Sequence, residues 1–164
     1  MKAAIKPAQA YELKLPLRLR RQLASEAELQ REMEERRRQR HEYDASFATR
    51  AKRMAFIKKL CRRIAAAYQP EKIILFGSHA YGTVTPESDV DLLIVMDFDG
   101  HPNEQAHKIR TELKLHTPLD LLVRTPHEIA WRLADGDMFI VQIVEDGKVM
   151  YENQHAGMDR KRRK

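Results

Sequence analysis

The centre of this sequence reads Lys72-Ile-Ile-Leu-Phe-Gly-Ser-His-Ala-Tyr-Gly-Thr-Val-Thr-Pro-Glu-Ser-Asp-Val-Asp-Leu-Leu-Ile-Val-Met96. Two apolar runs of strand length, Ile73–Phe76 and Leu92–Met96, flank a polar loop that is rich in Gly, Thr, Pro and Ser. Short runs rich in Ile, Leu and Val are typical of buried β-strands. The stretch therefore predicts two buried strands joined by a polar loop.

Two aspartates, Asp89 and Asp91, stand at the start of the second apolar run. Because side chains alternate along a strand, both are expected on the same face, with α-carbons roughly 6.5–7 Å apart. Two carboxylates beside a buried strand repel each other and lose hydration. A divalent cation such as Mg²⁺ relieves both costs, and Mg²⁺ commonly binds together with substrate phosphates. The pair therefore predicts a metal site.

Gly77 and Ser78 directly follow the first apolar run and are expected to open a short helical turn. Backbone N–H groups and a serine hydroxyl at such a place suit a phosphate. Gly77 has no side chain to obstruct the triphosphate of a nucleotide. A phosphate cradle and a metal pair at the ends of neighbouring strands suggest phosphoryl or nucleotidyl transfer.

A third aspartate, Asp120, interrupts the apolar run Leu119–Val123, which predicts another strand. A carboxylate in a buried strand is costly, so we expect Asp120 to have a function. Helical spacing and proline positions predict helices from about Phe47 to Gln69, over 103–115 and from Pro126 onward, and a last edge strand near 147–151. On the helix that begins at Pro126, we expect the apolar residues to face inward: Ile129, Ala130, Leu133 and, by packing rather than base stacking, Trp131.

The combination of Gly77-Ser78, Gly82 and Ser88-Asp89-Val90-Asp91 before an apolar strand resembles the signature of the polymerase-beta-like nucleotidyltransferase superfamily. Its spacing is most similar to the smallest branch, the minimal nucleotidyltransferases (MNT). The resemblance covers residues 55–152 and implies an α/β (α+β) fold with a small mixed sheet flanked by helices. His79 and Tyr81 depart from the arginines that many relatives have at these positions.

The resemblance also implies the site. Asp89, Asp91 and Asp120 would be catalytic and would hold two Mg²⁺ ions, and the nucleotide, ATP, would be bound by Gly77, Ser78 and Ser88. The implied reaction is transfer of AMP from ATP to a hydroxyl with release of pyrophosphate. Relatives of this size are typically the antitoxin halves of HEPN–MNT toxin–antitoxin pairs, and they add AMP to a tyrosine of the HEPN toxin. The expected function is therefore that of a protein adenylyltransferase and antitoxin.

Two other functions remain open at this point. One is a transferase that acts on a small molecule, as aminoglycoside nucleotidyltransferases do. The other is a non-enzymatic module that binds RNA or a toxin through its basic ends. Salt-sensitive RNA binding without nucleotide turnover would favour this function.

Charge is distributed unevenly along the chain. Lys and Arg outnumber Asp and Glu by 14 to 8 in residues 1–53 and by 5 to 1 in residues 158–164, but are outnumbered 15 to 11 in residues 54–157. We therefore expect a charged, partly helical N-terminal extension (1–53), a nucleotidyltransferase domain (54–152) and a basic C-terminal tail (153–164). Basic ends can bind nucleic acid or an acidic partner, or simply be solvated faces, and the extension can equally be a partner-docking arm.

Composition narrows the class of protein further. A chain of 164 residues has room for one domain with appendages. The single cysteine, Cys61, excludes an internal disulfide and favours a reducing compartment. No stretch approaches the roughly 20 apolar residues of a membrane span, and the first 21 residues lack the apolar core of a secretory signal. We expect a cytoplasmic protein without a membrane partner.

Overall fold

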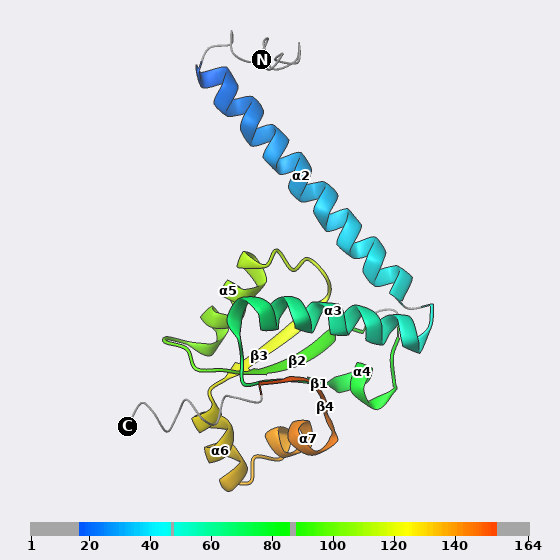
Figure 1. Cartoon of the computed structure of the whole chain (residues 1–164), viewed down its shortest axis with the longest axis vertical. Helices are drawn as coiled ribbons and strands as arrows, with labels where there is room; N and C mark the ends of the chain where they lie inside the picture. The colour runs from blue at the N-terminus through cyan, green and yellow to red at the C-terminus, as the bar shows by residue number, and fades with distance from the viewer. Residues whose placement is uncertain (1–16, 47, 86–87, 154–164) are drawn as a thin grey trace, which may run out of the picture. The chain divides into compact units, whose positions relative to one another are not determined.

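The computed structural model describes residues 17–46, 48–85 and 88–153, and the side chains of its first helix from residue 25 onward. The expectations for the first 16 residues and for the basic C-terminal tail lie outside this range. The elements, in chain order, are α2 (Leu17–Ser46), α3 (Arg50–Tyr68), β1 (Lys72–Phe76), α4 (Gly77–Tyr81), β2 (Val90–Val95), α5 (Pro102–Glu112), β3 (Leu119–Arg124), α6 (Pro126–Ala134), α7 (Met138–Asp146) and β4 (Lys148–Glu152) (Figure 1).

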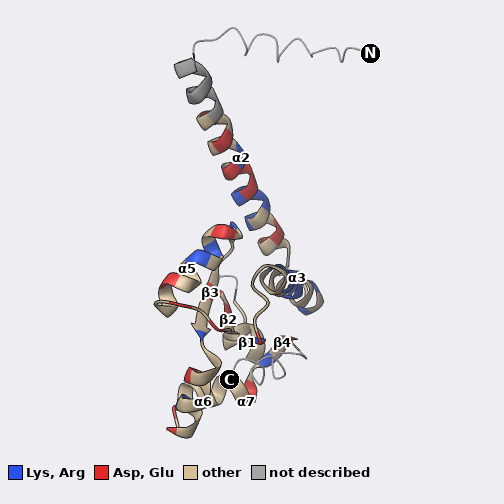
Figure 2. Ribbon diagram, turned by 60° about the vertical axis from the view of Figure 1, so that its left-hand side comes forward, with Lys and Arg blue, Asp and Glu red and all other residues tan. Residues whose placement is uncertain are grey.

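The chain divides into two compact units, Met1–Gln39 and Arg40–Lys164. In the first unit, the described part of α2 carries acidic and basic residues along its length (Figure 2). Arg36 pairs with Glu32 at 2.8 Å and Arg38 with Glu35 at 2.6 Å, one helical turn apart. Such pairs stabilise an exposed helix by only about 0.3–0.5 kcal/mol each.

The charged helix of the N-terminal extension and the helix that packs on the sheet are separate elements. α2 ends at Ser46, and α3 begins at Arg50 after Thr49, whose hydroxyl accepts a hydrogen bond from the Lys52 N–H at 3.1 Å. Threonine is a favourable N-cap because its side chain satisfies a helix donor that has no partner within the helix. At its other end, α3 stops before Gln69-Pro70 as predicted.

The second unit is built on one mixed sheet with the strand order β3-β2-β1-β4. β1 is antiparallel to both β2 and β4, whereas β2 and β3 are parallel. β2 lies between two strands and is covered on both faces, which explains its almost continuous apolar sequence. The predicted small mixed sheet with flanking helices is confirmed.

Helices cover the two faces of the sheet in pairs: α3 and α5 lie on one face, and α6 and α7 on the other (Figure 1). Leu92 and Ile94 of β2 pack in the core on the α3 face. Leu93 and Val95 point the opposite way and pack against α7. Since Asp91 has the same parity as Leu93, its side chain belongs to the α6–α7 face of the sheet.

The inward packing predicted for α6 is correct for Ile129, which packs against the core cluster that contains Leu93 and Ile140, and wrong for the other apolar residues. Of its described side chains none is buried: Ile129 is only partly buried, Ala130 is exposed, and Trp131 and Leu133 are 57% and 37% exposed. A hollow of about 440 Å³ explains this, because Ala130 and Leu133 line it together with residues of β1 and β2 instead of filling the space against the sheet.

None of the described helices combines the length and the apolar character needed to cross a membrane.

Candidate functional site

Asp91 and Asp120 lie side by side on the neighbouring parallel strands β2 and β3, where they are direct register partners. Strands that pair in this way are about 4.8 Å apart, and directly opposed side chains share a face. On its other side, Asp91 is the register partner of Phe76, the last residue of β1. The sheet therefore brings two of the three predicted aspartates together at the end where β1 leads into α4.

The three carboxylates are close enough to affect one another. Partial burial first, and then the negative charges of Asp120 and Asp89, raise the pKa of Asp91 from its usual 3.8 to about 6. Asp89 itself is exposed and precedes β2. Asp91 is thus the member of the group that bears the cost of desolvation and repulsion.

Asp120 differs from the sequence expectation in one respect. It was expected in a buried strand, but β3 is the edge strand of the sheet and the Asp120 side chain is exposed. The argument from burial therefore applies to Asp91 and not to Asp120. Exposure leaves the Asp120 carboxylate accessible to a molecule that approaches from solvent.

Gly77 packs directly against Asp91. Its φ is +65°, and a Cβ atom placed on it would lie 2.0 Å from the Asp91 Oδ2. Both the backbone conformation and the contact therefore require glycine. Gly77 opens α4, as predicted, and the far end of this short helix is held by the Lys148 ammonium, which donates to the Ala80 carbonyl at 2.5 Å.

Ser78 lies in the first turn of α4 and is partly buried, and its carbonyl accepts from the Gly82 N–H at 2.8 Å. Ser88 organises the loop before Asp89, because its Oγ accepts from the Thr85 N–H at 2.9 Å. The nucleotide contacts expected of Ser78 and Ser88 stay predictions.

Two residues at this site were not anticipated from the sequence. The Tyr43 hydroxyl donates to the Ser88 carbonyl, and the His79 Nε2 lies 3.4 Å from the same oxygen. Burial lowers the pKa of His79, which favours the neutral ring. Tyr43 was hidden within the highly charged sequence of α2, where an aromatic residue among charged neighbours was the only available signal.

The residues present fit a hard divalent cation. Within the described residues, no three His, Cys, Asp or Glu side chains already surround a common metal position. Asp91 and Asp120 nevertheless offer adjacent oxygen donors, and the raised pKa of Asp91 reflects burial and then charge repulsion, both of which a cation would offset. Mg²⁺ usually needs only one or two protein carboxylates, because water and substrate phosphates supply its other ligands.

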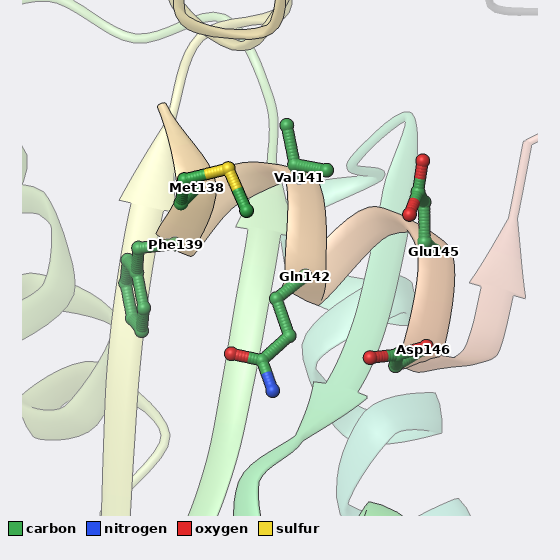
Figure 3. A pocket seen from close by; sticks show the side chains of 6 residues that line it. All are labelled: Met138, Phe139, Val141, Gln142, Glu145 and Asp146. Atoms are coloured by element: carbon green, nitrogen blue, oxygen red, sulfur yellow. The ribbon is translucent and has the colours of Figure 1, made fainter. Parts of the chain in front are cut away.

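A separate hollow of about 460 Å³ lies on α7, lined by Met138, Phe139, Val141, Gln142, Glu145 and Asp146 (Figure 3). Phe139 is 54% exposed and touches Phe76 edge to face, with ring centroids 5.9 Å apart. Because Phe76 is the register partner of Asp91, this contact links α7 to the strand end that carries the aspartates. None of the three aspartates lines the hollow itself.

Known proteins are similar in sequence to this part of the chain. Residues 54–150 match the family described as nucleotidyltransferase domain. A protein of Methanocaldococcus jannaschii, named as a candidate protein adenylyltransferase, is 32% identical over 97 residues, which cover 58% of this chain and 94% of that protein.

Two solved structures are also similar. A candidate nucleotidyltransferase from Sulfolobus solfataricus has a TM-score of 0.47 at 15% identity, with 66% of this chain and 88% of that chain covered. A structure described as a toxin–antitoxin with AMP-PNP has a TM-score of 0.39 at 22% identity, with 60% of this chain and 75% of that chain covered.

Proposed function

Since this chain belongs to the nucleotidyltransferase domain family, we propose that it transfers AMP from ATP to a hydroxyl group of a protein. The acceptor in this proposal is a tyrosine of a HEPN-type toxin, so that the chain is the antitoxin of the pair. The observation that carries the proposal is the adjacency of Asp91 and Asp120, with Asp89 close by and the open backbone of Gly77 against Asp91.

In the proposed reaction, the acceptor oxygen attacks the α-phosphorus of ATP. The bond from the α-phosphorus to the bridging oxygen breaks, and pyrophosphate leaves. Mg²⁺ bound at the site would neutralise charge on the phosphates and lower the pKa of the attacking hydroxyl. Asp89 and Asp91 would hold the metal, while the exposed Asp120 would complete the metal site and take the hydroxyl proton.

Gly77 and Ser78 orient the phosphates in this proposal. The absence of a side chain at Gly77 lets the triphosphate approach the backbone at the start of α4, beside the Asp91 carboxylate. Ser88 contributes from the end of the loop that leads to Asp89.

Two observations support a protein as the acceptor. The Methanocaldococcus relative is named for protein adenylyl transfer, and 94% of it is covered by the shared region. The α6–α7 face, on which the aspartates lie, also exposes large apolar side chains, namely Trp131 at 57%, Met138 at 76% and Phe139 at 54%. Exposed aromatic and methionine residues are enriched where proteins bind one another. The tyrosine and the HEPN-type toxin come from the resemblance of the motif to MNT antitoxins.

A second candidate function is supported by the hollow on α7. Its volume of about 460 Å³ lies in the range of small-molecule sites, and the exposed Glu145 and Asp146 at its margin suit a cationic acceptor. A polyamine-like antibiotic such as an aminoglycoside has this chemistry. None of the three aspartates lines this hollow, and we therefore place this function second.

The test uses the purified full chain with Mg²⁺, ATP labelled at the α-phosphate, and lysate of the host cell. Asp91→Asn and Asp120→Asn proteins serve as inactive controls. The proposal predicts label on one protein band, absent with either variant, and located on a tyrosine by mass spectrometry.

Other outcomes separate the alternatives. Label on an added aminoglycoside would select the small-molecule function. Absence of label from every fraction, with other nucleoside triphosphates also tried, would overturn the enzymatic proposal in favour of a binding module.

A further inference from the structure

The last turns of α2 belong to the same compact unit as the sheet. This unit begins at Arg40, whereas the family match begins at residue 54. Tyr43, in these last turns, is only 1% exposed and lies in the core that also contains residues of α3 and β2. Its ring packs edge to face on Phe56 of α3, with centroids 5.7 Å apart. Tyr43 is thus a core residue outside the segment that defines the family.

The hydroxyl end of Tyr43 reaches the loop that carries Asp89. It donates a hydrogen bond to the Ser88 carbonyl, 45 positions along the chain. The His79 ring approaches the same oxygen from α4, at 3.4 Å. Burial and the negative charge of Asp89 raise the pKa of Tyr43 to about 12, so its hydroxyl keeps its proton and remains a donor at neutral pH.

Asp89 needs such a restraint more than the other two aspartates do. Asp91 and Asp120 lie within strands, and the backbone ladder fixes them. Asp89 is exposed and precedes β2, so strand pairing does not fix it directly. On one side, the Val90 N–H donates to the Pro118 carbonyl at 3.2 Å. On the other side lies the Ser88 carbonyl, which accepts the hydrogen bond from the Tyr43 hydroxyl.

We infer that Tyr43 is a positioning residue of the nucleotidyl transfer. By fixing the Ser88 carbonyl, it sets the direction of the Asp89 carboxylate relative to Asp91 and Asp120. The inference rests on the proposed role of Asp89 as a metal-binding residue. It extends the functional site beyond the family segment to the end of the N-terminal helix.

The test compares Tyr43→Phe with Tyr68→Phe. Tyr68 is a matched control because its hydroxyl donates to Glu112 of α5, and its pKa is likewise raised to about 12. Each substitution removes one hydroxyl and keeps the ring. The measured quantity is Mn²⁺ binding in the presence of a non-hydrolysable ATP analogue, followed by electron paramagnetic resonance, so no acceptor is required.

We expect the Mn²⁺ dissociation constant to rise about five- to tenfold in Tyr43→Phe, the equivalent of one hydrogen bond, and to stay unchanged in Tyr68→Phe. The two variants should unfold at similar temperatures, and excess metal should restore the transfer rate of Tyr43→Phe. A purely structural role would instead lower the unfolding temperature of Tyr43→Phe without altering its metal affinity, and this result would overturn the inference.

An Asp89→Asn protein separates the inference from its premise. If Asp89→Asn loses metal affinity but Tyr43→Phe does not, the positioning role of Tyr43 is wrong and the proposed role of Asp89 stands. If Asp89→Asn binds Mn²⁺ as the parent protein does, the proposed metal role of Asp89 is wrong, and the inference that depends on it is overturned as well.

Discussion

Gly77→Ala is the substitution for which the geometry makes the sharpest prediction. The new Cβ would lie 2.0 Å from the Asp91 Oδ2, whereas ordinary contacts begin near 3.4 Å. The Asp91 carboxylate must therefore retreat by about 1.4 Å, and a misplacement of about 1 Å at a reacting centre costs roughly 100-fold in rate. The positive φ of Gly77 adds about 1–2 kcal/mol of backbone strain to the folded state.

Gly82→Ala is the matched control. Gly82 ends the same helix with φ +98°, but a Cβ atom there meets nothing within 4 Å. Both variants should therefore lose about 1–2 kcal/mol of unfolding free energy to backbone strain. Only Gly77→Ala should displace a carboxylate of the site.

The assay is the initial rate of label transfer from α-labelled ATP, together with urea unfolding of the same samples. We expect Gly77→Ala to transfer at roughly 1% of the parent rate or less, and Gly82→Ala to stay within a few-fold of it. Equal rates for the two variants at equal stability would refute the reasoning, because they would show that the position of the Asp91 carboxylate does not limit the reaction.

Three further predictions concern the carboxylates and the N-terminal segment. Asp91→Asn should raise the unfolding free energy of the metal-free protein by about 1–2 kcal/mol at neutral pH. Folding raises the pKa of Asp91 to about 6. The protonated carboxyl therefore makes its full contribution to the unfolding free energy below about pH 4, and this contribution is lost as the pH rises through 6. Urea titrations of parent and variant across this range should diverge with rising pH, and parallel curves would contradict the prediction. Asp120→Asn should abolish label transfer. Because the side chain is exposed, the substitution should leave the unfolding free energy within about 0.5 kcal/mol of the parent value. A fully active Asp120→Asn protein would exclude the proposed site. Removal of residues 1–39 should leave the thermal unfolding of the second unit unchanged. Removal of residues 1–48, which keeps the Thr49 cap of α3, should cost about 3–5 kcal/mol of unfolding free energy through the loss of the buried Tyr43. Equal unfolding temperatures for the two truncations would show that Tyr43 is not part of the core.

Local sequence patterns were sufficient to predict the centre of the fold. The apolar runs around Gly77-Ser78 and Asp91 predicted β1, the short helix α4 and β2, because strand length, β-branched content and glycine placement are all local properties. The run around Asp120 predicted β3 in the same way. The same local patterns predicted the candidate site residues, since all of them lie near strand ends or in the segment between β1 and β2.

The errors concern properties that depend on the assembled sheet. The order of strands decides that β3 is an edge, and hence that Asp120 is exposed, but no local pattern encodes this order. In the same way, the apolar stripe of α6 predicted burial, but Ala130 and Leu133 line a hollow and Trp131 is mostly exposed. Tyr43 was overlooked because its partner, Ser88, is remote in sequence and the helix around it is rich in charge.

The pairing of β4 with β1 has a consequence for synthesis of the chain. β1 is an inner strand only because Lys148–Glu152, the last strand in the described part of the chain, pairs with its outer side. The segments that carry the three aspartates are synthesised well before this strand. Until β4 has been synthesised, the apolar β1 has an unpaired edge that can pair with strands of other chains. A nascent or prematurely terminated chain would therefore contain all three aspartates of the proposed site and yet bind chaperones or aggregate.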